Sequence, residues 1–373
     1  MQVVHSRFNA LLSACVLSLI ATAGWSQSLT WLGVLPNGTH SFAHAVSADV
    51  AVVVGYAIVA AGQWRAFRWE NGVMQDLGTL GGNFSQAFGV SADGRVVVGW
   101  AQNAAGQGRA FRWENGSMQP LGTLGGDYSE AWGVSADGAV VVGRAQNAAG
   151  QFLAFRWTEL GGMQPLGTLG GTWSNAKAVS ADGRVVVGWA ENAAGQFRAL
   201  RWENGIMQDL GTLGGDFSVA NAVSADGSVV VGGADNDAGQ RRAFRWENGI
   251  MQDLGTLGGI SSEAQGVSAD GSVVVGVAVN AEKRAFRWTA SGGMEDLNTT
   301  YASLLTNGSV LRSASAISPD GRYIVGSGYN AATGRDEAFL LDTRCTLDGD
   351  VNGDGVVDDA DLLIVLFNFG NRY

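Results

Sequence analysis

The amino-acid sequence predicts an all-β fold, a seven-bladed β-propeller of four-stranded blades, and three observations support this prediction. A unit of about 44 residues occurs seven times, each unit contains four short extended segments separated by turn residues, and the last unit lacks a fourth strand that the beginning of the chain can supply. The composition agrees, because 56 of the 373 residues are Gly, which is unfavourable in helices.

Three strings of residues mark the repeated unit. VSADG begins at residues 90, 134, 179, 223 and 267, with variants at 46 and 317, and AFRW begins at 66, 110, 154, 243 and 285, with variants at 199 and 338. LGTLGG begins at 77, 121, 166, 210 and 254. This spacing matches the period of a propeller blade, whereas the coils of a β-solenoid, the main alternative, are usually shorter.

The second unit shows the expected elements in order. Its four strands are predicted at 87–91, 96–101, 109–113 and 118–122. Tight-turn dipeptides separate the first strand from the second, at 93–94, and the third from the fourth, at 115–116. The second strand is rich in Val, as buried strands are. Arg112 and its copies need partners inside the sheets. Where the fourth strand carries an Asp, we expect that Asp to be the partner, namely Asp76, Asp209, Asp253 or Asp296; units with Pro120 and Pro165 must satisfy their Arg otherwise.

The two ends of the repeated region predict how the ring closes. The seventh unit ends with residues 338–342 and has no fourth strand, while residues 31–35 at the start of the repeats resemble one. A closed ring in which this first strand completes the last blade accounts for both facts and leaves no exposed sheet edge. We therefore predict that the propeller spans residues 29–343.

The repeat resembles the HAF family of bacterial extracellular repeats. The residues that carry the resemblance are Arg109-Ala110-Phe111 and their copies, with Arg in the usual His place, together with DLGTLGG and VSADG, and they cover residues 29–342. The resemblance implies export of the protein and brings no common activity with it.

The N-terminus predicts a signal peptide over residues 1–26. Arg7 provides positive charge, residues 10–23 are apolar, and residues 21–23 form a small-x-small cleavage site. A lipoprotein signal ending at Cys15 is the alternative. The apolar stretch is shorter than the roughly 20 residues of a membrane-spanning helix, so we predict no transmembrane segment. The expected location is extracellular, with the periplasm and the cell surface as alternatives.

The C-terminal residues 345–373 predict a calcium-binding tail. Oxygen ligands stand at positions 1, 3, 5, 7, 9 and 12 of a loop, which is the spacing of a calcium loop. The predicted Ca²⁺ ligands are Asp350, Asn352, Asp354, the carbonyl of Val356, Asp358 and Asp361. The pattern resembles the half EF-hand of a type I dockerin repeat; a full dockerin has two such repeats, and the single copy here argues against a cohesin-type partner. An acidic tail without metal is the alternative.

The sequence contains no recognisable catalytic motif. GxSxG, HExxH and Cys/His clusters are all missing, and the net charge of −11 without a basic run argues against nucleic-acid binding. The predicted function is therefore non-enzymatic binding or scaffolding. The alternatives are a polysaccharide-active enzyme, a hydrolase or a lyase, and a carbohydrate-binding component of an extracellular degradative system. Glycoside hydrolysis would need two nearby carboxylates, for which Glu130, Glu263 and Asp127 are the candidates.

Positions that differ between the repeats predict a ligand site. The first strand of a blade is innermost, so its variable side chains should face the central channel, where an extracellular ligand such as a glycan could bind. The predicted channel residues are His44, Phe88, Trp132, Lys177, Asn221 and Gln265. A second set follows LGG and is aromatic in four units, at Phe84, Tyr128, Trp173 and Phe217. We assign Tyr128 and Trp173 to the ligand surface, with packing between blades as the alternative.

Overall fold

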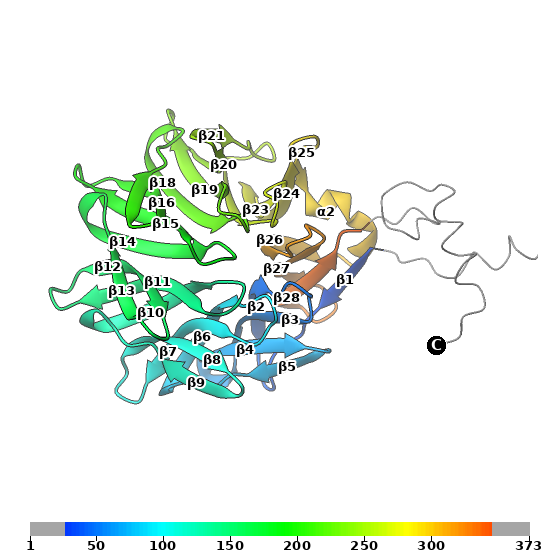
Figure 1. Ribbon diagram of the computed structural model, residues 1–373. Coiled ribbons are helices and arrows are strands. Elements are labelled where there is room, and N and C mark those ends of the chain that lie inside the picture. Colours follow the sequence, from blue (N-terminus) through cyan, green and yellow to red (C-terminus); the bar gives the residue numbers. More distant parts are fainter. Residues whose placement is uncertain (1–26, 345–373) are drawn as a thin grey trace, which may run out of the picture. The chain divides into compact units, whose positions relative to one another are not determined.

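The computed structural model describes residues 27–344, and the predicted signal peptide and calcium loop lie outside these described residues. Residues Leu29–Leu341 form one compact unit. It consists of seven antiparallel four-stranded sheets arranged as the blades of a propeller around a central channel (Figure 1). The predicted fold class is therefore confirmed.

The strands follow the repeated sequence in order. Blades one to three contain β2 (His40–Val46), β3 (Val52–Ile58), β4 (Trp64–Glu70), β5 (Val73–Asp76), β6 (Gly81–Val90), β7 (Val97–Asn103), β8 (Gly108–Glu114), β9 (Ser117–Pro120), β10 (Gly125–Val134), β11 (Val140–Asn147), β12 (Phe152–Thr158) and β13 (Gly162–Gly167). Blades four to six contain β14 (Gly170–Val179), β15 (Val185–Asn192), β16 (Phe197–Glu203), β17 (Ile206–Asp209), β18 (Gly214–Val223), β19 (Val229–Asn236), β20 (Arg241–Glu247), β21 (Ile250–Asp253), β22 (Ser261–Val267), β23 (Val273–Asn280), β24 (Glu282–Thr289) and β25 (Gly293–Asp296).

The seventh blade closes the ring as the sequence predicts. It contains β26 (Val310–Ile317), β27 (Tyr323–Asn330) and β28 (Arg335–Asp342), and its fourth strand is β1 (Ser28–Trp31) from the beginning of the chain (Figure 1). The predicted strand, 31–35, was placed too late and overlaps β1 only at Trp31. Three short helical segments interrupt the repeats: η1 (Ala60–Gly62), α2 (Leu297–Thr300) and η2 (Ala302–Leu304).

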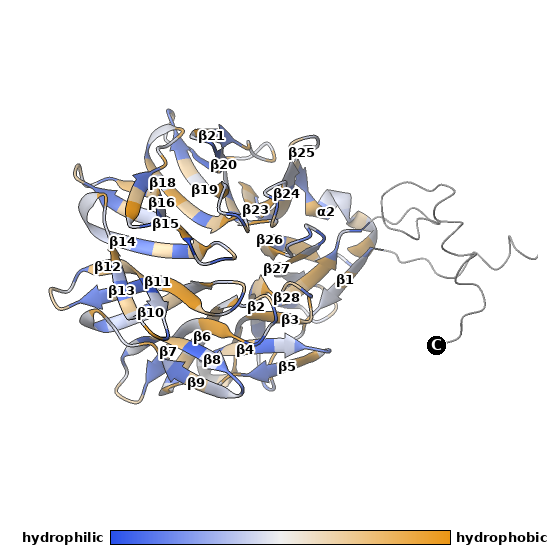
Figure 2. Ribbon diagram, viewed as in Figure 1, coloured by the Kyte–Doolittle hydropathy of each residue, from blue (hydrophilic) through white to orange (hydrophobic). Residues whose placement is uncertain are grey.

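The hydrophobic core lies between neighbouring sheets. The Phe of each AFRW string, for example Phe111, is completely buried, as are the Val residues of the second strands such as Val97 and Val98. Hydrophobic residues are concentrated in the inner strands, and the outermost strands such as β9 and β21 are hydrophilic (Figure 2). Burial of this apolar surface is the main stabilising contribution to the fold.

The expected pairing of these Arg side chains with Asp is wrong. In four blades the Arg instead contacts a Glu two residues further along the same strand, for example at 2.7 Å for Arg68–Glu70 and 2.8 Å for Arg201–Glu203. Residues two apart on a strand share a face, which makes this local pair possible. In blade six Arg287 pairs with Glu295 on the fourth strand at 3.1 Å. Asp76 lies 3.9 Å from Arg65 and accepts a hydrogen bond from the Gly78 amide.

The SAD turns form a ring of backbone hydrogen bonds around the channel. The Ala92 amide donates to the Ala136 carbonyl of the next blade at 2.9 Å, and the same contact recurs from Ala48 in blade one to Pro319 in blade seven. The turns themselves are held by Asp side chains; Asp93, for example, accepts from the Ser91 hydroxyl at 2.6 Å. These Asp residues therefore stabilise hairpins, as expected for a residue copied in all seven units.

Candidate binding site in the central channel

A β-bulge in each innermost strand positions the candidate site. In β6 the pairing register shifts between Ala87 and Gly89, so Phe88 is the extra residue of the bulge. Shifts at the equivalent place occur in all seven inner strands, and the bulged residues are His44, Phe88, Trp132, Lys177, Asn221, Gln265 and Ser315. Bulges re-aim side chains, and here they aim seven different side chains at one axis.

A glycine on the second strand is the physical cause of this bulge. A Cβ on Gly99 would lie 2.0 Å from the backbone oxygen of Gln86 on the neighbouring strand. Equivalent glycines stand in every blade, and the closest backbone approach at each of them is between 1.9 and 2.1 Å. Only a residue without a side chain permits this close approach, which the VVVG string of the sequence provides.

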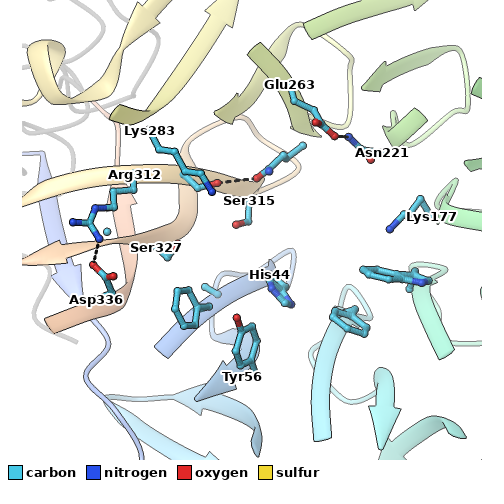
Figure 3. Close-up of a pocket in the computed structure, with 17 residues that line it drawn as sticks. His44, Tyr56, Lys177, Asn221, Glu263, Lys283, Arg312, Ser315, Ser327 and Asp336 are labelled. Atoms are coloured by element: carbon cyan, nitrogen blue, oxygen red, sulfur yellow. Dashed lines mark hydrogen bonds and ion pairs between the residues drawn. The ribbon is translucent and has the colours of Figure 1, made fainter. Parts of the chain in front are cut away.

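The bulged side chains surround a cavity of about 560 Å³, which we call the channel cavity. Its lining includes all six channel residues that the sequence predicts, and Ser315 as the seventh. Other lining residues, among them Tyr56, Lys283, Ser327 and Asp336, come from second and third strands (Figure 3). A cavity of this volume falls within the range of small-ligand sites.

One side of the channel cavity is an aromatic stack that crosses three blades. The His44 and Phe88 rings are stacked with centroids 5.3 Å apart, and Phe88 and Trp132 are stacked at 4.2 Å. The Lys177 amine lies over the other face of Trp132, 3.3 Å from the ring centroid, in a cation–π contact. The faces of Phe88 and Trp132 are thus covered by their neighbours, which leaves ring edges and the amine for a ligand.

The opposite side of the channel cavity is polar. The Asn221 amide donates to Glu263 Oε1 and to the Ala264 carbonyl, both at 2.9 Å. The Ser313 hydroxyl donates to Gln265 Oε1 at 2.9 Å. Figure 3 shows Lys177 beside Asn221 and Glu263 at one side of the space, with Ser315 and His44 across from Lys177. The cavity therefore combines hydrogen-bonding groups with apolar ring edges.

Burial changes the protonation of two residues in the stack. Desolvation lowers the pKa of His44 to about 4, with the Lys177 charge acting in the same direction and the Ala87 carbonyl opposing it. His44 is therefore neutral at pH 7 and donates from Nδ1 to the Ala87 carbonyl at 3.0 Å. Desolvation also lowers the pKa of Lys177 to about 8, so its amine is still mostly protonated at neutral pH.

Glu130 supports the aromatic stack from behind. Its carboxylate accepts from the Tyr128 hydroxyl at 2.8 Å and from the Trp132 indole at 2.9 Å, and it lies 2.5 Å from Arg144 Nε. Burial, reinforced by the charge of Glu130, raises the pKa of Tyr128. Because Glu130 is buried and its oxygens bond three neighbouring groups, it orients Trp132.

The structure separates the two aromatic residues Tyr128 and Trp173 from the channel cavity. Tyr128 and Trp173 flank Phe152, with centroid distances of 5.6 and 6.1 Å, and this row runs across the junction of neighbouring blades. Trp173 is 44 % exposed. Neither residue lines the channel cavity. The geometry fits the packing alternative; whether the exposed face of Trp173 binds a ligand stays a prediction.

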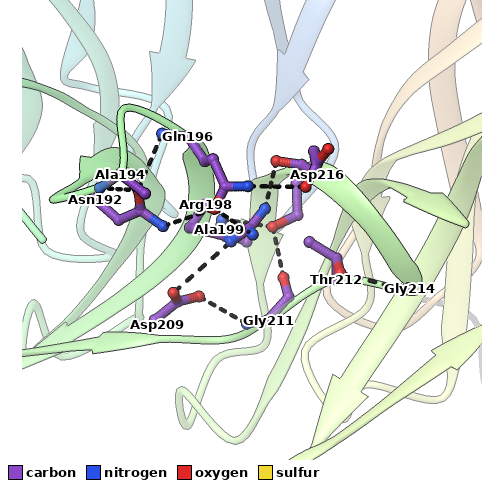
Figure 4. A network of polar contacts seen from close by, with 11 residues as sticks. Asn192, Ala194, Gln196, Arg198, Ala199, Asp209, Gly211, Thr212, Gly214 and Asp216 are labelled. Carbon is purple, nitrogen blue, oxygen red and sulfur yellow. Dashed lines mark hydrogen bonds and ion pairs between the residues drawn. The ribbon is translucent and has the colours of Figure 1, made fainter. Parts of the chain in front are cut away.

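Polar contacts join neighbouring blades on the side of the LGG segments. At the junction of blades four and five, Gln196 donates to the Asp216 carboxylate at 2.8 Å, and Arg198 donates to the Asp216 carbonyl (Figure 4). The Ser218 hydroxyl donates to the Gly211 carbonyl at 2.6 Å and accepts from the Ala199 amide of the preceding blade at 2.8 Å. The blades around the cavity are therefore fixed relative to one another.

Of the three candidate carboxylates for glycoside hydrolysis, only Glu263 lies at the channel cavity. Glu263 lines the channel cavity, whereas Glu130 does not and is held by its three partners. Asp127 accepts from the Gln107 side chain at 2.9 Å at a blade junction. Within residues 27–344, no cluster of three or more His, Cys, Asp or Glu side chains could hold a metal ion.

The sequence did not indicate four polar lining residues, Lys283, Arg312, Ser327 and Asp336. Arg312 is the extra residue of a second bulge in β26, where the register shifts between Leu311 and Ser313, and it forms an ion pair with Asp336. The irregular spacing of the seventh unit was the one feature of the sequence that could have indicated this second bulge. Lys283 is one of only two lysines in the chain, the other being Lys177.

The fold is that of a seven-bladed β-propeller, and a solved β-propeller structure is similar to it. The β-propeller domain of the Trilobed protease from Pyrococcus furiosus, described as having an open velcro topology, is similar with a TM-score of 0.54 and 11 % identity, over 85 % of this chain and 98 % of that chain. TolB from Acinetobacter baumannii is similar with a TM-score of 0.45 and 12 % identity, over 84 % of this chain; the match spans 66 % of the TolB chain.

The likeness to the protease propeller domain shows the fold alone. No protein-family model and no curated protein matches the sequence. In the part of the chain that the structure describes, no helix is long and apolar enough to cross a membrane.

Proposed function

We propose that this protein is an exported, non-enzymatic binding propeller whose ligand occupies the channel cavity. The observation that carries the proposal is the set of seven bulged side chains: the backbone repeats in every blade, while the side chain at the bulge differs in every blade. A repeated scaffold with one variable position per repeat, directed at a single cavity, is the arrangement expected of a recognition site.

The chemistry of the channel cavity favours a small polar ligand such as one end of a glycan. Amide, hydroxyl and carboxylate groups on one side can bond the hydroxyls of a sugar, and the ring edges of Phe88 and Trp132 offer apolar contact. Hydrolysis of a glycan is less well supported than binding. Of the described carboxylates near the cavity, Glu130 is held by three partners and Asp336 is paired with Arg312.

Export and calcium binding belong to the same proposal. They are supported by the signal-like residues 1–26, by the resemblance of the repeats to extracellular ones, and by the calcium-loop spacing of Asp350, Asn352, Asp354, Val356, Asp358 and Asp361. In this view the propeller binds a ligand outside the cytoplasm, and the tail uses Ca²⁺ to fold into a contact site for a cell-wall component or another exported protein.

A blocking substitution tests whether the channel cavity binds the ligand. The mature protein is screened on a glycan array, and positive glycans are measured with Ser315→Trp, which places an indole in the cavity. Ser117→Trp is the matched control, because Ser117 is exposed on an outermost strand. We expect Ser315→Trp to abolish binding and Ser117→Trp to retain it. Undiminished binding by a folded Ser315→Trp variant would remove the channel from the proposal.

A further inference from the structure

The positive charge of the channel cavity is unusual for this chain. The protein carries a net charge of −11 and contains only two lysines, yet both Lys177 and Lys283 line the same cavity, together with Arg312. Lys177 is on β14, Lys283 on β24 and Arg312 on β26, so three different blades contribute one cation each. Two carboxylates, Glu263 and Asp336, also line the cavity, so its three cations leave a net positive charge in an acidic protein.

The Lys177 amine is available to a ligand. None of the ion pairs between described residues includes Lys177, and its contact is with the face of Trp132. The Trp132 indole donates to Glu130, which fixes the ring and, through it, the amine. An ammonium group over an aromatic ring directs part of its three N–H donors at the ring and leaves the rest free, and a partly buried ammonium group gains most from an anionic partner.

The remaining groups show which kind of anion fits. A simple inorganic anion would need only cations, but Lys177 faces Glu263, whose carboxylate also accepts a hydrogen bond from Asn221. Carboxylates repel an anion and bind hydroxyl groups well. A ligand with one negative group and several hydroxyls satisfies both sides of the cavity, and a sugar acid is the simplest molecule of that description.

We propose that the channel cavity recognises an acidic sugar, a hexuronic acid, with its carboxylate on the Lys177 amine and its hydroxyl groups on Glu263 and Asn221. This inference rests on the proposed function, since it names the ligand class of the same site. Lys283 adds positive potential elsewhere on the cavity wall, which attracts an anion to an otherwise acidic protein, whereas the charge of Arg312 is balanced by Asp336.

The protonation of Lys177 gives the proposal a pH signature. The groups that face Lys177 are Glu130 on β10, Arg144 on β11, Glu263 on β22 and His44 on β2. Burial holds the pKa of the free amine near 8, and a bound carboxylate stabilises the protonated form, so affinity should fall as the pH rises through that value. His44, with a pKa of about 4, is neutral throughout this range.

Titration calorimetry of the mature protein with D-galacturonate, D-glucuronate and the neutral sugars D-galactose and D-glucose tests the inference. We expect one of the uronates to bind at least about tenfold more tightly than its neutral counterpart, and Lys177→Met to remove that preference, since a hydrogen bond to a charged group contributes this much. Arg95→Met removes the same charge from an exposed turn and should leave binding unchanged. Lys177→Arg should bind without the loss of affinity above pH 8, because Arg stays protonated.

The outcomes separate this inference from the function on which it rests. Equal affinity for uronate and neutral sugar, or an unchanged preference in Lys177→Met, would overturn the acidic-sugar proposal and leave the binding propeller standing. If inorganic sulfate displaced the bound uronate as effectively as free uronate does, the proposal would also be overturned, because the site would then recognise negative charge and not the sugar hydroxyls. Ligands that bind equally to Ser315→Trp would overturn both proposals.

Discussion

The Lys177 amine lies 3.3 Å from the centroid of the Trp132 ring, and the two residues occupy the same bulge position in neighbouring blades. An ammonium group and an indole thus meet across a blade junction because the backbone places both side chains on the channel axis. The amine is partly desolvated and makes no ion pair with a described residue, so its charge is a cost to the folded state that a ligand can relieve.

This cost predicts a pH dependence of stability. The pKa of Lys177 is about 8 in the folded state and near the ordinary lysine value of 10.5 in the unfolded state, so between these values the unfolded chain binds more protons. The free energy of unfolding of the wild type should therefore rise relative to that of Lys177→Met as the pH increases from about 8 to about 10. Urea unfolding at several pH values measures the difference. The difference between wild type and the control Arg95→Met should not change with pH. If the difference between wild type and Lys177→Met also stays constant from pH 8 to 10, the prediction is contradicted.

The closing strand predicts a strong effect of one buried leucine. Leu35 follows β1 and is 2 % exposed, in a cluster with Leu32, Val325 and Ala338 that joins blade seven to blade one. Leu35→Ala should lower the free energy of unfolding by about 2–4 kcal/mol, because a buried leucine leaves a cavity. Leu160→Ala is the control, since Leu160 is fully exposed, and it should have little effect. Equal urea midpoints for the two variants would show that the closure is not important for stability.

Two adjacent glycines on β19 predict opposite outcomes. A Cβ on Gly232 would lie 1.9 Å from the backbone oxygen of Val219, whereas a Cβ on Gly233 would meet only side-chain atoms, the nearest at 3.0 Å on Arg241. Gly232→Ala should therefore disrupt the bulge at Asn221 and destabilise the blade, and Gly233→Ala should be tolerated. Thermal unfolding compares the two variants. Similar melting temperatures would argue against the glycine as the cause of the bulge.

The tail predicts calcium binding by the full-length mature chain. Terbium luminescence should report one site that Ca²⁺ displaces, and Asp354→Asn should weaken the site because it removes a charged ligand at position 5 of the loop. Glu159→Gln removes one negative charge from an exposed position of the propeller and serves as the control. Absence of a terbium signal, or equal affinity in both variants, would contradict the predicted loop.

Much of the fold could be predicted because the repeat is so regular. Counting VSADG and AFRW gave seven blades, and the missing fourth strand of the last unit indicated how β1 closes the ring. The variable residues of the inner strands were predicted to face the channel, and they line the channel cavity. The alternation of side chains along a strand does not explain why one residue of every blade points into the channel; the bulge explains it. The glycine that causes the bulge is part of the VVVG string, which the sequence analysis interpreted only as a buried strand.

Other features could not be predicted, for physical reasons that differ. The predicted Asp partner of Arg68 was wrong, because Glu70, two residues away on the same strand, pairs with it instead of Asp76 on the next strand. Lys283 and Arg312 reach the cavity from a third strand and from an irregular bulge in the seventh unit, where a pattern derived from the other units does not apply. The calcium loop lies outside the described residues and stays a prediction.

The ring of SAD turns has a built-in weak point at Pro319. Each of six junctions is joined by an amide of one turn and a carbonyl of the next, ending with the Ala269 amide and the Pro319 carbonyl. Proline has no N–H, so the link from blade seven back to Ala48 of blade one is missing a donor. Transient separation of blades should therefore begin at this junction, where the docked first strand, the apolar cluster around Leu35 and the hydrogen bond from the Ala338 amide to the Ser41 hydroxyl must resist it without a turn-to-turn link. Anything that loosens the start of the mature chain would open the propeller there, and would let a ligand enter or leave from the side.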